Sequence, residues 1–581
     1  SAGFITVLIL LISQGFLVSL FDDPEKRLIA AILDPFGDSA IQYYTRYWTV
    51  SEQNELYLPI REVLIYNRLL WGALGIILFG AIYKVFSFSQ NAFSFSFKSK
   101  ESKRITKSNF GGIIKINLPK ISFDFSFKNE LKTLWKLSTV DFFVIVKSWP
   151  FICIVLVGLL INLIGLSELG NVFGTSTLPR TWRMLEAGST FTLAINICTF
   201  LYAGILIHRS RIANINQLID VSPTKNWVLF GSKFLAIFKM QIALSSLIMI
   251  TGLIFQTYKG FYDYEISLYL YELIVLNLIY FILWSFLAFF VQTLISSPYV
   301  GLFVMIVLLI GIPLLGLAGI EQSIFKYTQG PGFSYSDMNG YGDTLNRYFI
   351  YKMYWFSLGI VFFILTSLFY FRGLPSNFKE RVLIAKSRFN GKYPFFISLF
   401  TLIFLSSGTY IYYTNNILNK RTSSKESELQ TVEGEKKYKK YEAYAQPRII
   451  SVNVDVDIFP KTRDLSASGE YLMINKTQES IDSIFLDHNS LISTFKFNKE
   501  NKLVLEDTIY NLDIYKLKSP LKPGDSLKLE FSIKNKPNTI LRNNSSVISN
   551  GTFINSNIFP SLGYQLGELR DDKTRKKYGL P

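Results

Sequence analysis

The pattern of hydrophobic positions predicts a protein that crosses a membrane many times. Long apolar runs alternate with polar connections over the first 413 residues. A helix that crosses about 30 Å of hydrocarbon needs roughly 20 predominantly apolar residues, and we expect Pro313 to kink the seventh run. The nine runs that approach this length have the approximate limits 3–20, 68–88, 149–167, 188–208, 229–254, 268–293, 299–319, 350–371 and 394–413.

The placement of charge predicts the orientation of these helices. Lys and Arg are concentrated in 89–148, 209–228 and 372–393, and the connections between the other runs are on balance acidic. Because positive loops stay on the cytoplasmic side, these three segments are expected inside. Everything after about residue 414 is then expected outside.

One polar connection, 208–236, has a helical pattern of its own. Apolar residues recur in it at spacings of three and four, opposite polar ones, which predicts a short amphipathic helix. Ser222 and Pro223 read as an N-cap and first-turn proline that open the next helix. The segment is thus either an elbow that lies against a membrane or partner, or a solvated connector, and periodicity favours neither. The apolar positions are Ile212, Ile215, Leu218 and Ile219, and the polar ones are Arg209, Arg211, Asn214 and Gln217.

The basic segment 89–148 is rich in Phe and Ser and contains two similar stretches, FSFSFK and FDFSFK. This pattern predicts a pair of short strands or a low-complexity linker near anionic headgroups. A role with nucleic acid is the less favoured reading, since basic inner loops are ordinary in membrane proteins.

The C-terminal part changes character. Residues 414–446 are rich in Lys and Glu and predict a charged stalk or helix. In 450–458, Ile and Val alternate strictly with Ser, Asn and Asp, which predicts a half-buried strand. Similar patterns recur in SGEYLMIN, IDSIFLD, TIYNLDIY and SLKLEFSIKN, with a turn at 523–525. Residues 447–581 are therefore expected to form an antiparallel β domain of sandwich or saddle type.

Composition agrees with a membrane protein, since 49% of the residues are hydrophobic and 16% aromatic. The net charge of +17 then reflects the inner loops more than a nucleic-acid partner. Cys153 and Cys198 both lie in apolar runs, so neither a disulfide framework nor a thiolate site is predicted. The sequence starts in an apolar run without a basic leader and ends at KKYGLP, and we expect it to be a fragment of a longer chain.

The runs from 149 to 371 form a helix pair, a cytoplasmic elbow, three helices, an external loop and a last helix. This order resembles the ABC-2 type transporter permease unit, in which the elbow contacts the ATPase. The resemblance implies that residues 1–88, with external loop 21–67, end a preceding unit, that 89–148 link the two, and that 372–413 hold a loop and a ninth helix. The residues it assigns to ATPase docking are Arg209, Arg211, Ile212, Ile215, Leu218, Ile219, Asp220 and Pro223.

Two further stretches, LDPFGDSAIQYYTRYWT at 33–49 and NGTFINSNIFPSLGYQLGELRDDKTRKKYGLP at the end, resemble a bacterial family that fuses such a permease to an M1-type aminopeptidase. The resemblance implies an inner-membrane location, a periplasmic β domain and a zinc domain further downstream. However, the chain has no H-E-x-x-H pair, and His208 and His488 are its only histidines. No catalytic or metal-binding residue is therefore assigned.

The resemblance also implies which partners the chain has. The chain has no P-loop, so ATP is expected on a separate ATPase subunit and no cofactor in this chain. Membrane lipid and an unidentified substrate are the other expected partners, nucleic acid is not, and homodimeric and heterodimeric assembly both stay open.

A second candidate site is the external loop, where charged and aromatic residues occur together. Its residues are either braces and an interfacial aromatic belt, or a surface that passes substrate to the outer domain. Within the membrane runs, Lys239 and Glu272 are expected to reach the interface, and buried amides to join helices. The candidate loop residues are Asp34, Arg46, Trp48 and Arg61.

Three functions are consistent with these patterns. The first is the permease of an ABC-2 type exporter, in which ATP-driven closure of the ATPase moves the elbow and rocks one helix bundle against the other. The second is the membrane anchor and N-terminal domain of a zinc-dependent M1 aminopeptidase. The third is a membrane scaffold that transports nothing and binds a periplasmic partner.

Overall fold

The computed structural model describes the chain in thirteen stretches. Seven helices among these residues are long and apolar enough to cross a membrane, which indicates a multi-pass membrane protein. They are Glu62–Gly80, Trp149–Leu166, Thr181–Ile212, Asn226–Tyr258, Ile266–Leu294, Thr344–Phe369 and Lys392–Leu418. The described residues are 26–49, 52, 55–58, 60–85, 126–169, 171–172, 175–373, 378–419, 421–488, 492–537, 545–548, 550 and 552–580.

Two of the nine predicted spans are not among these seven. The run 3–20 lies outside the described residues. The run 299–319 forms α14 (Pro298–Leu314), which has only 17 residues. Pro313 does not kink a longer helix as predicted, because α14 ends one residue after it. A proline lacks the N–H that would continue the ladder, and turns follow instead.

The chain divides into two compact units, of which the first comprises 1–198 and 223–270. Near its start three helices form a small cluster of their own, α2 (Arg27–Leu33), α3 (Asp38–Thr45) and α5 (Glu62–Val85). Asp34 is buried between α2 and α3 and accepts hydrogen bonds from the N–H of Phe36 at 3.0 Å and of Ser39 at 2.7 Å. The Asn67 amide donates to the Asp34 carbonyl at 2.7 Å and so ties α5 to the turn.

Longer helices make up the rest of the first unit. Helix α6 packs along α11, and the Lys239 ammonium of α11 donates to the hydroxyls of Ser138 and Thr139, both at 2.8 Å. Lys239 therefore binds a neighbouring helix and does not extend freely to the interface as predicted. The elements are α6 (Phe127–Val146), α7 (Trp149–Glu168), β1 (Asn171–Val172), β2 (Thr175–Ser176), α8 (Thr181–Gly188), η1 (Ser189–Phe191), α11 (Asn226–Tyr258) and α12 (Ile266–Leu270).

Helix α6 also corrects the prediction for the insert 89–148. Its last twenty residues are neither strands nor linker, because 127–146 form a regular helix whose Ser126 side chain accepts a hydrogen bond from the N–H of Asn129. Alternating Phe and Ser near its start suggested a strand, but the apolar positions further on follow helical spacing. The NAFSFSFKSK stretch lies outside the described residues.

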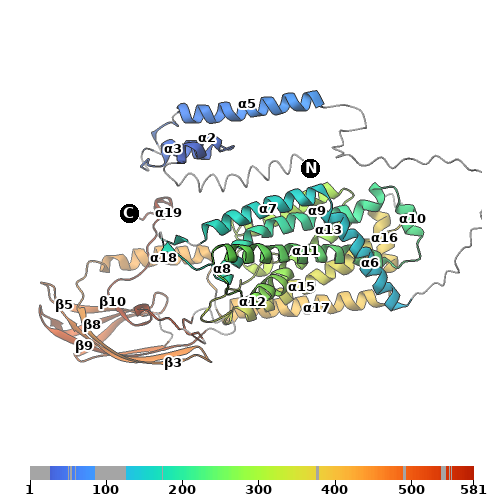
Figure 1. Cartoon of the computed structure of the whole chain (residues 1–581). Coiled ribbons are helices and arrows are strands. Elements are labelled where there is room, and N and C mark those ends of the chain that lie inside the picture. Colours follow the sequence, from blue (N-terminus) through green and yellow to red (C-terminus); the bar gives the residue numbers. More distant parts are fainter. Residues whose placement is uncertain are drawn as a thin grey trace, which may run out of the picture. The chain divides into compact units, whose positions relative to one another are not determined.

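The second unit comprises 199–222 and 271–581. Its helix α15 packs against both α13 and α17 (Figure 1). Aromatic rings fill these contacts, such as Tyr354 stacked on Phe404 with centroids 4.4 Å apart. The elements of its helical part are α9 (Thr192–Ile212, which starts in the first unit), α10 (Asn216–Val221), the π-helical turn η2 (Tyr271–Leu276), α13 (Asn277–Leu294), α14, η3 (Ser323–Phe325), α15 (Thr344–Phe369), α16 (Phe378–Arg388), α17 (Lys392–Tyr413) and η4 (Thr414–Leu418).

A buried amide on α13 joins two neighbouring helices. The Gln292 side chain donates to the carbonyl of Pro298 at 3.1 Å and of Phe200 at 3.4 Å. A β-carbon at Gly204 or Gly301 would lie 2.6 Å or 2.3 Å from this amide. Only glycine leaves room there, so the two glycines let α9 and α14 approach α13 around one polar group.

The C-terminal region contains two four-stranded antiparallel sheets, in the orders β3-β4-β9-β6 and β10-β5-β8-β7. Side chains from both sheets share one core that includes Tyr471, Leu486, Leu517 and Phe531. The predicted antiparallel β region is confirmed, although β6 and β7 were missed because short charged strands alternate poorly. The strands are β3 (Arg448–Phe459), β4 (Asp464–Ile474), β5 (Ile481–Asp487), β6 (Ile492–Phe497), β7 (Asn501–Asp507), β8 (Leu512–Leu521), β9 (Ser526–Asn535) and β10 (Ser561–Leu562).

The predicted stalk contains a helix, α18 (Ser424–Tyr438), followed by η5 (Lys439–Tyr441). Ser423 and Glu426 form a capping box at its start. At its end Tyr438 joins a small core with Phe485, Leu512 and Ile514 of the second sheet, so α18 lies along the sheets (Figure 1). The short elements η6 (Ser556–Ile558) and α19 (Asp572–Lys577) complete the region.

Asp507 anchors α18 to the sheet. Its carboxylate accepts hydrogen bonds from the Tyr438 hydroxyl, from the Lys437 ammonium at 2.9 Å and from the N–H of Ile509 at 3.1 Å and Tyr510 at 3.3 Å. Burial by itself would raise the pKa of Asp507, but these hydrogen bonds outweigh it and lower the pKa from 3.8 to about 2.

We predict that this anchor makes the β region sensitive to acid. Because the folded pKa lies below the unfolded one, the stabilisation is present above about pH 4 and is lost as the pH falls towards 2. Asp507→Asn should lower stability at neutral pH by about 1.5–3 kcal/mol and flatten the loss between pH 4 and 2. Hydrogen exchange of β7 and β8, measured against pH in the full chain, checks this. Asp457→Asn, at an exposed position of β3, is the control and should leave the profile unchanged.

Candidate functional site: the elbow

The predicted elbow is present, with different bounds. Helix α9 continues to Ile212, so Arg209 and Arg211 belong to its last turn. Asn214 then adopts φ 55°, which breaks the helix, and α10 covers only six residues. Ser222 closes α10 and does not cap the next helix as predicted, because Lys225 occupies the N-cap of α11 and Pro223 lies exposed before it.

Four apolar side chains of the elbow point away from the protein. Ile212 is 65% exposed, Ile215 44%, Leu218 78% and Val221 86%. They recur at every third position and form one row, which we call the apolar row. Ile219, the remaining predicted apolar residue, is only partly exposed. Exposed apolar side chains in a contiguous group mark a surface that binds something.

The base of the elbow is tied to the segment that follows α15. The Asp220 carboxylate accepts a hydrogen bond from the N–H of Gly373 at 2.8 Å. The Arg372 guanidinium donates to the carbonyl of Ser222 at 3.0 Å and of Asp220 at 3.4 Å. Gly373 has φ +86°, a conformation that other residues adopt only with strain. These contacts hold the C-terminal end of α10.

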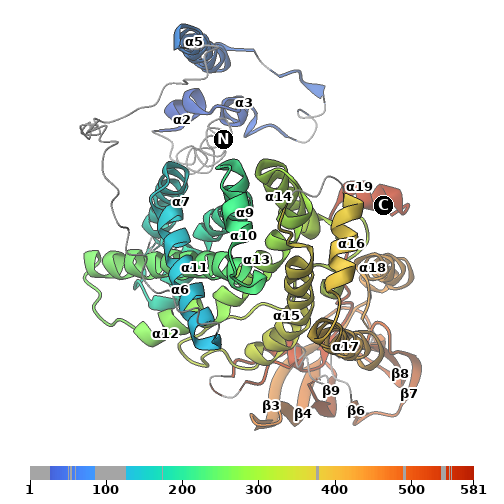
Figure 2. The same ribbon diagram turned by 90° about the vertical axis from the view of Figure 1, so that its right-hand side faces the viewer.

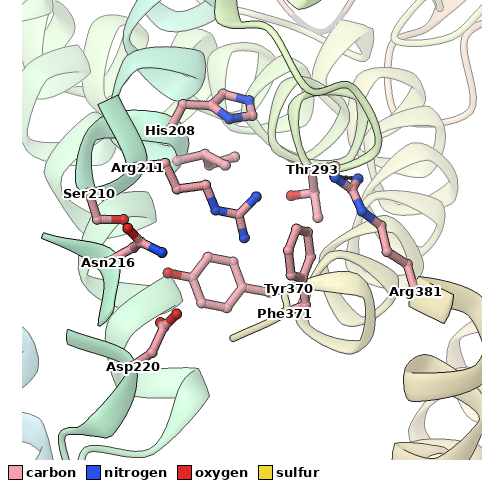
Figure 3. A pocket seen from close by; sticks show the side chains of 10 residues that line it. His208, Ser210, Arg211, Asn216, Asp220, Thr293, Tyr370, Phe371 and Arg381 are labelled. Carbon is pink, nitrogen blue, oxygen red and sulfur yellow. Dashed lines mark hydrogen bonds between the residues drawn. The ribbon is translucent and has the colours of Figure 1, made fainter. Parts of the chain in front are cut away.

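Two arginines meet at one aromatic ring beneath the elbow. Arg211 lies 3.8 Å and Arg381 4.3 Å from the centre of the Phe371 ring. Figure 3 shows the Arg211 guanidinium pointing between Tyr370 and Phe371, with Arg381 on the far side. Stacking on a ring lets two like charges share a small space.

The Arg381 guanidinium also reaches the end of α13. It donates to the carbonyls of Thr293 and Leu294 at 3.4 and 3.3 Å, where a helix C-terminus attracts positive charge. Partial burial lowers the pKa of Arg381. His208 lies nearby, with Nε2 3.2 Å from the Gln292 carbonyl. The elbow, α13 and α16 are thereby joined around one basic cluster.

The space between these residues is too small for a substrate. The cavity has a volume of about 20 Å³ and is lined by His208, Arg211, Asp220 and Arg381 among others. This is room for about one water molecule. The arrangement therefore connects helices, and the exposed apolar row lies outside it.

The external-loop candidates differ in burial. Asp34 is fully buried and braces its turn, as the simpler alternative predicts. Arg46 and Arg61 are exposed, and Trp48 is partly exposed. Glu272, in a π-helical turn, accepts a hydrogen bond from the Tyr341 hydroxyl at 3.0 Å, which fits a bracing role as well.

Sequence reasoning missed two polar features. Lys352 on α15 is 8% exposed, and its ammonium donates to the Thr328 carbonyl at 3.0 Å and lies 5.1 Å from the Tyr348 ring centre. The signal was a lysine inside an apolar run. Arg463, at the β3–β4 turn, binds the Asp343 carboxylate at 2.7 Å and joins the β region to the segment before α15. No local pattern predicts that pair, since 120 positions separate its members.

Within the described residues, no group of three His, Cys, Asp or Glu side chains could hold a metal ion. His488 Nε2 lies 3.6 Å from the Asp513 carboxylate, a pairing of single side chains. Comparison of the chain with protein-family models, curated proteins and solved structures finds no match. The functional assignment therefore rests on the elbow itself.

We predict that Asp220 keeps the elbow segment 213–222 ordered. Asp220→Ala removes the acceptor for the Gly373 N–H, a loss of about 1–3 kcal/mol, so hydrogen exchange in 213–222 should accelerate by roughly tenfold or more. Asp220→Asn keeps an oxygen in place and should restore most of the protection. Equal exchange in all three proteins would show that the contact does not hold the elbow.

Proposed function

We propose that this chain is the membrane component of an ABC-2 type exporter in a bacterial inner membrane, and that the apolar row docks a separate ATPase subunit. The observation that carries the proposal is the exposure of Ile212, Ile215, Leu218 and Val221 on a base fixed by hydrogen bonds. A fixed base and exposed apolar side chains suit a helix that binds in a groove of a partner, because little conformational entropy is lost on binding.

The chemistry of the elbow favours a protein partner over the membrane surface. Helices that lie on membranes carry Lys and Arg on the polar face, which attract anionic headgroups. Helix α10 has neither residue, and its one charged side chain is Asp220. With only six residues it also buries too little apolar area to hold itself in an interface. A hydrophobic groove on a partner protein fits the row better.

The joint under the row gives docking a mechanical consequence. The elbow is continuous with α9, and Arg372 and Gly373 connect it to the end of α15. Arg381 connects the same cluster to α13 and α16. In the proposed mechanism, ATP-driven closure of the partner displaces the elbow, and the displacement reaches four helices, α9, α13, α15 and α16, together. This is the kind of rigid-body shift that alternating access needs.

The test is co-purification of ATPase activity with the chain from native membranes. Leu218→Asp with Ile215→Asp should reduce the co-purified activity by about tenfold or more, because central apolar anchors dominate such interfaces. The matched control is Leu317→Asp, which changes an equally exposed leucine in the turn after α14 (87% against 78% exposed).

We expect Leu317→Asp to retain the ATPase. Retention of full ATPase activity by the elbow variant, or an equal loss in the control, would contradict the docking role.

A further inference from the structure

No strand among the described residues pairs with the outer edge of β3, which is the longest sheet edge in the β region. Strand β3 has 12 residues and stands at the end of the order β3-β4-β9-β6 (Figure 2). The other described edge strands are shorter, with 7 residues in β7, 6 in β6 and 2 in β10. Proteins usually keep edge strands short or protect them with Lys or Pro. Between Ile449 and Phe459, β3 contains neither.

Most of the core-side face of β3 is exposed, contrary to the predicted half-burial, and only Val454 in its middle packs against the core. Val452, Val456 and Ile458 pair with the buried residues Tyr471, Ala467 and Leu465 of β4, so they face the same side as the core. Yet Val452 is 59%, Val456 38% and Ile458 40% exposed. The strand and its alternation are as predicted, but the second sheet does not extend over its edge.

A cleft opens beside the first half of this face. It has a volume of about 1070 Å³ and is lined by Ile449, Val452 and Tyr471 on one side and by Ile554, Phe559 and Gln565 on the other. Clefts of this size hold ligands as large as several amino-acid side chains. The cleft, the apolar face and the free strand edge adjoin one another at Val452.

The charges on β3 determine which strand can pair with its outer edge. On the outer face of β3, Asp455 and Asp457 are both exposed. If two copies of β3 paired antiparallel with their valines on one face, Asp455 would lie opposite Asp455 or Asp457 in two of the three central registers. Like charges directly opposite destabilise a strand pair. A strand with Lys or Arg at these positions would instead pair favourably.

We propose that β3 binds an extended peptide segment of a partner protein by adding a strand to the open edge. The segment alternates apolar residues, which cover Val452 and Val456 and enter the cleft, with basic residues, which face Asp455 and Asp457. Main-chain hydrogen bonds to the free edge supply affinity and the alternate side chains supply selectivity. This site is independent of the elbow and of the transport proposal.

The first experiment measures fluorescence anisotropy of a labelled probe of about eight residues, alternating Val and Lys, with the full chain in nanodiscs. The alternating probe should bind saturably. A probe of the same composition with all Val before all Lys should bind about tenfold more weakly or worse, since only alternation places each residue type on its own face. In a third probe, the backbone nitrogens that face β3, which are every second one, are methylated. This probe should bind about as weakly as the block probe.

The second experiment uses matched variants. Val452→Lys should weaken the alternating probe about tenfold or more. Val504→Lys changes an equally exposed valine on β7, the edge of the other sheet (60% against 59% exposed), and should leave binding unchanged. Asp455→Lys with Asp457→Lys should reverse the preference towards a probe that alternates Val and Glu, a gain of binding that misfolding cannot produce.

Three results would overturn the proposal. Equal binding of the alternating and block probes would indicate charge attraction alone. Equal losses in Val452→Lys and Val504→Lys would place the binding elsewhere. Concentration-dependent dimerisation that Val452→Lys abolishes would make a second copy of this chain the occupant.

Discussion

A six-residue helix does not hold its shape by its own hydrogen bonds, so the elbow depends on the contacts of Asp220 and Ser222 with Arg372 and Gly373. These contacts come from a segment more than 150 positions away. These contacts fix the position of α10, and the exposed side chains of the apolar row are held in place as a result. The same segment supplies Phe371, on which Arg211 and Arg381 stack. The binding surface and the joint between helices are therefore built by one set of side chains.

Elsewhere in the helical region, several buried polar side chains join particular helices. Gln292 donates to carbonyls of α9 and α14, and two glycines make the space for it. Lys352 is buried against a carbonyl and aromatic rings. In an apolar surrounding an unpaired polar group is costly, so such contacts fix which helices lie together. In the C-terminal region, three charged side chains connect neighbouring segments. Asp507 connects the β region to α18, Arg463 connects it to the segment before α15, and Glu321 connects the loop after α14 to the segment before α18.

Periodicity predicted the elements well where one physical rule dominates. Seven long apolar helices, the helix in the stalk and the alternation of β3 all follow from local pattern. The errors arose where distant contacts decide. The helix at 127–146 overrode an apparent strand repeat, the end of α9 absorbed part of the expected elbow helix, and most of β3 stayed exposed although β4 pairs along its whole length. Of the site, sequence analysis named Arg211, Asp220 and three residues of the apolar row, but not its fourth residue, Val221. It also did not name Phe371, Arg372 or Arg381, since nothing local links 370–381 to the elbow.

The central claim is that the apolar row contacts an ATP-binding protein, and photo-crosslinking tests it most directly. A photoreactive residue at Leu218, the centre of the row, would be activated in intact membranes, and the products identified by mass spectrometry. We expect one dominant crosslink to a protein that contains a phosphate-binding P-loop, and none from the same residue placed at Leu317. Crosslinks from Leu218 to lipid alone would contradict the account and leave the elbow as a membrane-surface segment.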